Sequence, residues 1–303
     1  MIGRVLIKGF FFFIFSFIVF ACTGFNDNRL DKEDSENKKE NTSKQTELLH
    51  AGFRYSSYGP EYNPGLNYWL SVGNRIVANF KNCSPQSVWI VGVLKGQGTF
   101  LNFPVETESE LIQYSSLDMN EETFDLFDEN GVEVWLQVEP GNSDVEELIH
   151  LILKRYSHHK CVIGVGVDVE WYKSTDKAEG RAVTDLEANH WLSIVQSYNT
   201  DYRLFLKHWL IEKMPPKARK DIVFVDDSQQ LGSLQNMTDE FDQWAKAFYP
   251  SKVSFQVGYE NDKVWWGNFT NPSQAIGNAL VSEIENMEAL FWVDFTVLEV
   301  FPE

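Results

Sequence analysis

Hydrophobic positions along the chain fall into short runs that alternate with longer stretches in which apolar residues recur at helical spacing. A β-branched run bounded by glycine or proline is typical of a buried strand, whereas spacings of three and four residues are typical of an amphipathic helix. The pattern predicts strands at residues 51–55, 88–94, 132–138, 161–169, 202–209, 221–225, 253–258 and 290–295. It predicts helices at residues 67–80, 121–130, 143–156, 184–197, 238–248 and 273–287, with Ser143 and Thr238 as N-caps.

This order of elements predicts an α/β protein with a single (β/α)8 barrel, of the TIM type, over residues 51–303. Barrels of this kind typically need about 250 residues, which the segment provides. The alternative is a doubly wound open sheet, which usually carries a glycine-rich phosphate turn after an early strand. No G-x-G-x-x-G motif occurs in the sequence, so the barrel is favoured.

The first residues have the pattern of an export signal. Arg4 and Lys8 precede residues 9–21, an apolar run that contains seven phenylalanines. A short positive region followed by such a run is typical of a secretory signal, and the run is short for a spanning helix. Its end, residues 19–22 (VFAC), resembles the bacterial lipoprotein box, which implies cleavage before Cys22 and lipidation of its thiol. The alternative is an uncleaved N-terminal anchor.

A charged segment separates this signal from the predicted barrel. Residues 26–49 are nearly free of apolar side chains and show no helical stripe, which is typical of a solvated tether. We therefore expect three parts: a signal at residues 1–21, a disordered tether at 22–50 and the barrel at 51–303. The barrel is expected outside the cytoplasmic membrane, anchored at the cell envelope or cell surface by its N-terminal lipid.

Composition narrows the choice of partner. The chain has 303 residues with 26 Lys and Arg against 44 Asp and Glu, a formal net charge of −18. Phosphate backbones require the opposite sign, so we expect no nucleic-acid partner. Ten Trp and eleven Tyr suit a protein that stacks flat apolar faces such as those of sugar rings. We expect a carbohydrate ligand and a monomer.

Cysteines and histidines give little further chemistry. Cys83 and Cys161 remain beside the lipidated cysteine, and a disulfide or two free thiols are both open. The sequence His-His-Lys-Cys at 158–161 suggests metal binding, but no second ligand cluster at zinc spacing follows. We interpret it as a polar loop and expect no metal and no cofactor.

Polar side chains mark the carboxyl ends of the predicted strands, where a barrel holds its catalytic residues. On the strand at 161–169, alternation places two glycines, Asp168 and Glu170 on one face. The opposite face runs from Ile163 to Val169 and is β-branched, so the acids are expected to point inward. Close carboxyl groups do not both ionise readily, and a raised pKa gives the general acid that glycosidic cleavage needs.

A second acid is expected beside this pair. The same alternation on the strand at 132–138 brings Glu139 to the barrel mouth next to Glu170. A carboxyl separation of about 5–5.5 Å is typical of retaining glycosidases, and about 6.5–9.5 Å of inverting ones. The sequence leaves both open.

These residues resemble two families of glycoside hydrolases. Residues 166–171 (GVDVEW) look like the fourth-strand pattern D-G-x-D-x-D-x-E of family 18, the chitinase-like barrels, and residues 256–260 (QVGYE) resemble its later tyrosine motif. Trp292 stands where those barrels place a tryptophan floor under the sugar. In that register Tyr172 occupies the position of the catalytic Glu, and Glu170 replaces the last Asp. The triplet Asp-Val-Glu also resembles the D-x-E of the lysozyme-like family 25, which implies that Glu170 is the acid.

The sequence therefore predicts a glycoside-hydrolase-like barrel in which Glu170 protonates the leaving oxygen, Asp168 tunes it and Glu139 acts as nucleophile or base. The alternative for Glu170 and Asp168 is that they have no catalytic role and form a structural ion pair with Lys207 or Arg54. A non-catalytic glycan-binding lipoprotein and a structural envelope protein are the alternatives for the whole chain. The residues predicted to bind substrate are Tyr259, Gln256, Trp292, Asp294, Asp226, Lys207, Trp171 and Tyr172.

Overall fold

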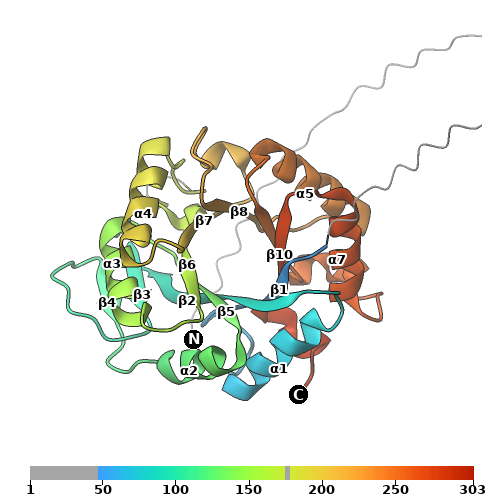
Figure 1. Cartoon of the computed structure of the whole chain (residues 1–303), viewed down its shortest axis with the longest axis horizontal. Helices are drawn as coiled ribbons and strands as arrows, with labels where there is room; N and C mark the ends of the chain where they lie inside the picture. The colour runs from blue at the N-terminus through green and yellow to red at the C-terminus, as the bar shows by residue number, and fades with distance from the viewer. Residues whose placement is uncertain (1–46, 175–177) are drawn as a thin grey trace, which may run out of the picture. The chain divides into compact units, whose positions relative to one another are not determined.

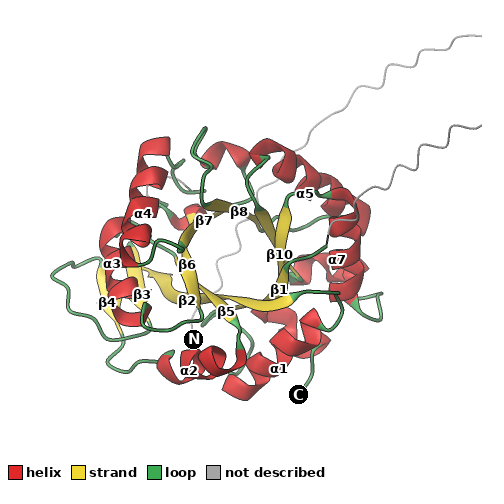
Figure 2. Ribbon diagram, viewed as in Figure 1, coloured by secondary structure: helices red, strands yellow, loops and turns green. Residues whose placement is uncertain are grey.

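A computed structural model describes residues 47–174 and 178–303, and within them the strands form a closed barrel surrounded by helices (Figures 1 and 2). Eight parallel strands make the ring, in the order β1-β10-β9-β8-β7-β6-β5-β2, and pairing of β1 with β2 closes it. The predicted (β/α)8 fold is confirmed. The ring strands are β1 (His50–Tyr55), β2 (Ser84–Lys95), β5 (Glu133–Val138), β6 (Val162–Asp168), β7 (Arg203–Lys207), β8 (Ile222–Asp226), β9 (Val253–Val257) and β10 (Met287–Val293).

One strand extends beyond the ring. The end of β2 pairs antiparallel with β3 (Gly98–Leu101), and β3 pairs with β4 (Ile112–Tyr114), outside the barrel. The sequence analysis treats this region as a loop, because each of these strands is short and lies among turn residues. The extension matters for the site because it positions the segment after β2 next to the end of β5.

The helices pack around the ring as predicted, but several begin at other residues. They are α1 (Leu66–Val77), α2 (Glu121–Asn130), α3 (Val145–Tyr156), α4 (Asp185–Tyr198), α5 (Leu234–Phe248), α6 (Lys263–Trp266), α7 (Pro272–Glu283) and α8 (Val297–Val300). Asp144, not Ser143, caps α3, and Ser233 caps α5, so Thr238 lies inside that helix. Residues 208–221, described throughout, join β7 to β8 through a 3-10 turn at Ile211–Lys213 instead of an α-helix.

Two apolar layers hold the barrel. One lies between strands and helices, where Phe224 of β8 stacks on Phe248 of α5 with ring centroids 4.1 Å apart. The other fills the lumen and includes Trp135, Phe205 and Phe291 from alternate positions of their strands. Such a packed floor is typical of these barrels, whose polar chemistry lies above it at the carboxyl ends of the strands.

Glycines of β6 make room for this lumen layer. A Cβ on Gly166 would lie 1.9 Å from the ring of Phe205, so only glycine allows that ring to cross the strand. Gly164 lies at a register shift between β5 and β6. The shift turns Ile163 towards the lumen cluster, which corrects the prediction that Ile163 shares the outer face with Val165 and Val167.

The predicted signal and residues 22–46 of the predicted tether, including Cys22, lie outside the described residues. The last residues assigned to the tether are described, and they belong to the folded part: Leu48 is 3% exposed within the core, and His50 begins β1. In the described part, no helix is sufficiently long and apolar to span a membrane. Cys83 and Cys161, whose pairing the sequence leaves open, are both free thiols.

Candidate functional site

A buried lysine links two acids at the barrel mouth. The Nζ of Lys207, at the end of β7, lies 2.9 Å from Asp168 Oδ2 and 2.5 Å from Asp227 Oδ2. All three side chains are at most 6% exposed, so the ammonium group and both carboxylates are withdrawn from water. Asp168 points inward as predicted, but it belongs to this ion-pair network. For Asp168, the structure therefore shows the alternative considered above, an ion pair with Lys207.

Several acids surround Lys207. Burial acts to lower the pKa of Lys207, but the nearby acids, Asp168 and Asp227 first, outweigh it and raise the pKa, so the ammonium group keeps its positive charge. Burial raises the pKa of Asp168, and the nearby carboxylates of Glu170, Asp227 and Glu139 add to the effect while Lys207 opposes it. The predicted rise of a carboxyl pKa at this mouth thus appears on more than one acid.

Several buried polar atoms line the same inner space with unused hydrogen-bonding capacity. No hydrogen-bond partner lies among the described residues for Gln137 Oε1, Asp168 Oδ1, Asp227 Oδ1 or Gln256 Nε2. Leaving such atoms unpaired costs free energy, so a polar inner space of this kind favours ordered water or polar ligand groups. Gln256 therefore lies where the sequence predicts, on the inner face of β9.

Glu170 differs from these groups because it reaches solvent. Strand β6 ends at Asp168, and Glu170 lies in the 3-10 turn Val169–Trp171 that follows. Its side chain lines a cleft of about 500 Å³ together with Trp209, Asp227 and residues of the 228–231 loop. Burial raises the pKa of Glu170 to about 7; Lys207 opposes the shift, and Asp227 and Glu139 add to it. A carboxyl of this kind holds its proton near neutral pH and can donate it.

Glu139 lies close by but is closed off. Its Oε2 accepts hydrogen bonds from the hydroxyl of Tyr58 at 2.5 Å and from the backbone N–H of Leu94 at 2.7 Å, and the residue is 3% exposed. Burial raises the pKa of Glu139, while those two hydrogen bonds oppose the shift. The sequence analysis missed Tyr58, because its loop after β1 carries no strand pattern.

Trp209 is a second residue that sequence reasoning missed. It follows β7 directly, lines the cleft beside Glu170 and is half-buried, with its ring centroid 4.3 Å from that of His208. A half-exposed indole beside an acid is a suitable surface for a sugar ring. A signal for this residue was present, because Trp209 ends the predicted strand at 202–209, but only Lys207 of that strand was predicted to bind substrate.

Tyr259 lies inside the mouth beside the predicted Gln256. Its hydroxyl is 3.5 Å from both Asp227 Oδ2 and Gln256 Oε1, and burial raises its pKa. Both residues are at most 5% exposed, so they lie behind the cleft and not on its open face. Trp171 lies in the same turn as Glu170 and is half-buried, so its predicted contact with substrate stays a prediction.

Asp294 is fully engaged in holding two strands together. Its Oδ1 accepts hydrogen bonds from the Arg54 guanidinium, and its Oδ2 accepts from the backbone N–H of Ser56 at 2.7 Å and from the Ser56 hydroxyl. The residue is 0% exposed. Asp294 thus links β1 to the end of β10, and the prediction that it binds substrate is wrong.

Three further predicted residues point away from the lumen. Trp292 packs edge-on against Trp266 of α6, with centroids 5.3 Å apart, so it is not a sugar floor. Tyr172 packs on Trp191 of α4 and accepts a hydrogen bond from Arg181. Asp226 follows outward-facing Phe224 by two residues, and Asp227 takes the inner position. Asp226 and Trp292 lie on the outer faces of β8 and β10, and Tyr172 follows the turn after β6, where the register of the strand no longer applies.

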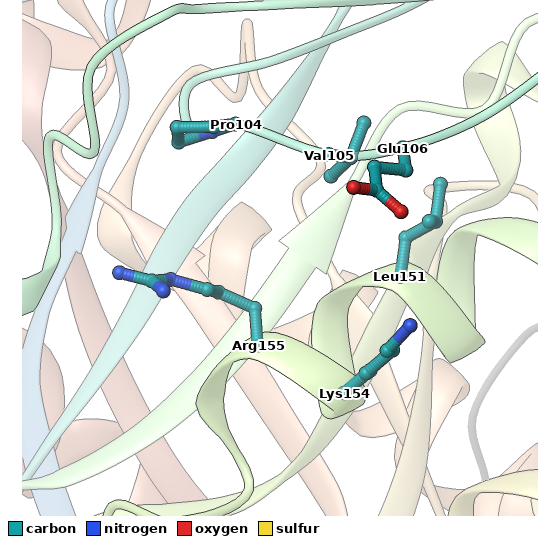
Figure 3. Close-up of a pocket in the computed structure, with 6 residues that line it drawn as sticks. All are labelled: Pro104, Val105, Glu106, Leu151, Lys154 and Arg155. Atoms are coloured by element: carbon teal, nitrogen blue, oxygen red, sulfur yellow. The ribbon is translucent and has the colours of Figure 1, made fainter.

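Other cavities lie away from the mouth. Figure 3 shows a surface pocket of about 440 Å³ between the segment after β3 and α3, lined by Pro104, Val105, Glu106, Leu151, Lys154 and Arg155. It contains no cluster of buried acids. A second, at the amino ends of β7 to β9, is lined by Arg203, Arg219 and neighbouring residues. The cleft beside Glu170 remains the candidate site because that acid, whose pKa is raised, lines it together with Trp209.

No protein-family model and no curated protein matches the chain. Among solved structures it is similar to a protein provisionally described as an alpha-L-fucosidase from Bacteroides thetaiotaomicron, with 10% identity, a TM-score of 0.53, and coverage of 87% of this chain and 91% of that one. An endocellulase from the archaeon Pyrococcus horikoshii matches with 12% identity, a TM-score of 0.44, and coverage of 82% and 84%. The first similarity supports the barrel fold and, at this identity, the fold alone.

Proposed function

We propose that this protein cleaves a glycosidic bond in a poly- or oligosaccharide, with Glu170 as the general acid. One observation carries the proposal: Glu170 has a pKa of about 7 and lies in an open cleft with Trp209 and Asp227. Glycosidases need a protonated carboxyl group, a second carboxylate and a surface for the sugar ring. Known glycoside hydrolases share the barrel fold, which is compatible with the proposal but does not carry it.

In this scheme the proton of Glu170 passes to the glycosidic oxygen as the bond to the anomeric carbon breaks. Asp227 is the second carboxylate: its side chain is mostly buried against Lys207, but it is also among the residues that line the cleft with Glu170, and so it borders both regions. It either attacks the anomeric carbon or takes a proton from the attacking water. Glu139, predicted from the sequence to fill this role, is instead assigned to raising the Glu170 pKa, since Tyr58 and Leu94 occupy one of its oxygens.

The test is to incubate the protein with a panel of polysaccharides and oligosaccharides and to measure hydrolysis as the release of reducing ends. The substitution Glu170→Gln keeps the shape of the side chain but removes its acidic proton, so we expect kcat to fall roughly 10²–10⁴-fold. Glu260→Gln is the matched control, because Glu260 is an acid on an exposed turn after β9 with a side chain 68% exposed. Equal turnover by wild type and Glu170→Gln refutes the assignment.

A glycan-binding protein without turnover is the second candidate. One observation favours it: Asp168 and Glu139, two of the three predicted catalytic acids, are 2% and 3% exposed and held by other groups. This candidate predicts glycan binding by calorimetry with no product after long incubation. It also predicts equal affinity in wild type and Glu170→Gln.

We further propose that the chain is exported and anchored by lipid on Cys22, as the resemblance of residues 19–22 to a lipoprotein box implies. In a bacterial host, labelled palmitate should be incorporated into wild type and not into Cys22→Ala. Detergent-phase partition should be lost in parallel. Labelling of the variant at the wild-type level contradicts the proposal.

A further inference from the structure

Three side chains of metal-ligating type meet outside the barrel lumen, between α2 and the turn that precedes β6. Glu121 is the first residue of α2, and His158 and His159 belong to the turn after α3 (Figure 1). The sequence analysis expected no metal there because no second ligand cluster lies near residues 158–161. The fold supplies the missing ligand from 37 residues earlier in the chain.

Distances between the ligand atoms suit one small cation. Glu121 Oε1 lies 3.0 Å from His158 Nε2 and 3.6 Å from His159 Nε2, and all three atoms are within 4.8 Å of one another. Zinc binds nitrogen and oxygen at about 2.0–2.2 Å in a tetrahedron, which separates its ligands by about 3.3 Å. The two separations from Glu121 Oε1 lie on either side of that value.

His159 provides the second, independent observation. Its side chain is 1% exposed, and Nε2 has no hydrogen-bond partner among the described residues. The other ring nitrogen, Nδ1, lies 2.9 Å from Asp128 Oδ2, and Asp128 Oδ1 accepts from the Cys161 backbone N–H at 2.6 Å. A carboxylate on one ring nitrogen and a free second nitrogen is the usual arrangement of a zinc-binding histidine. Nε2 also faces Glu121 Oε1 at 3.6 Å, so one ion between the two atoms can bind both.

The carboxylate ligand is also held in place. Arg155 donates to Glu121 Oε2 at 3.0 Å and to Asp118 Oδ2 at 2.7 Å. This leaves Oε1 of Glu121 directed at the two histidines. Glu121 and His159 are therefore both oriented by neighbouring groups before any ion binds.

We propose that Glu121, His158 and His159 bind a zinc ion, with Asp128 and Arg155 as positioning residues. The fourth position of the ion is open to solvent, because the side chains of Glu121 and His158 are 33% and 56% exposed. The ion ties the start of α2 to the turn before β6 and stabilises that junction.

Cys161 is the competing ligand, since it groups with Asp128 and His159. Its thiol already donates to the carbonyl oxygen of Phe124 at 3.7 Å. Asp128 lies 2.9 Å from Nδ1 of His159, whereas Nε2 of His159 has no hydrogen-bond partner among the described residues and faces Glu121.

The experiment uses the full-length chain, stripped with a chelator and titrated with zinc chloride by calorimetry. We expect one ion per chain and at least tenfold weaker binding in His158→Ala and in Glu121→Gln. His150→Ala is the matched control, because His150 is an exposed histidine near the acid Glu146. The affinity of this variant for zinc should equal that of wild type. Absence of binding, or equal affinity in wild type, His158→Ala and Glu121→Gln, overturns the proposal.

Cobalt(II) in place of zinc identifies the ligands directly. Binding through Glu121 and the two histidines gives no thiolate-to-cobalt charge-transfer band, and Cys161→Ser leaves the affinity unchanged. A charge-transfer band that disappears in Cys161→Ser contradicts this ligand set. Asp128→Asn should weaken binding about 10–100-fold, as expected for a group that orients a ligand.

Discussion

Asp168 and Glu170 are two residues apart, yet they belong to regions with opposite properties. Asp168 ends β6 in the closed interior, paired with Lys207 and 2% exposed. Glu170 lies in the turn beyond the strand and lines the open cleft with Trp209. The closed region holds charges by pairing them, whereas the open one presents a carboxyl group whose pKa is shifted to about 7. The end of a strand therefore separates an acid held in an ion pair from one that lines an open cleft.

Removing the central cation should affect the closed region most. In Lys207→Met, Asp168 and Asp227 lose their shared partner while remaining buried. We expect a loss of roughly 3–5 kcal/mol in the free energy of unfolding, measured with urea at pH 7. Adding Asp168→Asn and Asp227→Asn to the same chain should recover part of that loss. A loss below about 1 kcal/mol in the single variant shows that the network does not hold the barrel.

The open region should respond to pH in a characteristic direction. The folded pKa of Glu170 is raised from 4.5 to about 7, so the group favours folding below pH 4.5, and this contribution is lost as pH rises through about 7. Glu170→Gln removes the effect, and its stability relative to wild type should increase between pH 5 and pH 8 by on the order of 1–3 kcal/mol. Urea unfolding at both pH values measures this, and an unchanged difference contradicts the raised pKa.

Two tryptophans give the finest comparison of the regions. Trp209 is half-exposed in the cleft, whereas Trp292 is 1% exposed behind the barrel. Trp209→Ala should weaken glycan binding about tenfold, or about 1.4 kcal/mol, with little change in thermal midpoint. Trp292→Phe should lower the midpoint and leave affinity unchanged. The reverse outcome, measured by calorimetry and thermal unfolding, would restore Trp292 as the sugar platform.

Periodicity predicted the strands of the ring because most of their residues are buried, so that short, mainly apolar segments stand out between turn residues. It missed β3 and β4, which are short and lie outside the ring. The predicted starts of α3 and α5 were wrong, because several neighbouring residues can act as the N-cap and only the backbone geometry selects Asp144 and Ser233.

For the site, alternation correctly placed Asp168 inside the barrel, and the family resemblance correctly placed Gln256 there. The resemblance failed for Trp292, which lies on the outer face of β10, and for Tyr172, which follows β6 and its turn. Beyond the end of a strand the period of two no longer applies. The same limit hid Tyr58 and Trp209, which come from loops. The zinc ligands were missed for another reason: Glu121 and His159 become neighbours only through the packing of α2 against the turn after α3.

The proton affinity of Glu170 tests the central claim most directly. Carbon-13 NMR of the glutamate carboxyl groups, with Glu170→Gln to assign the signal, measures it without knowledge of the sugar. We predict a titration midpoint near pH 7. A midpoint near the ordinary value of 4.5 would mean that Glu170 is ionised at neutral pH, and the proposed general acid would be wrong.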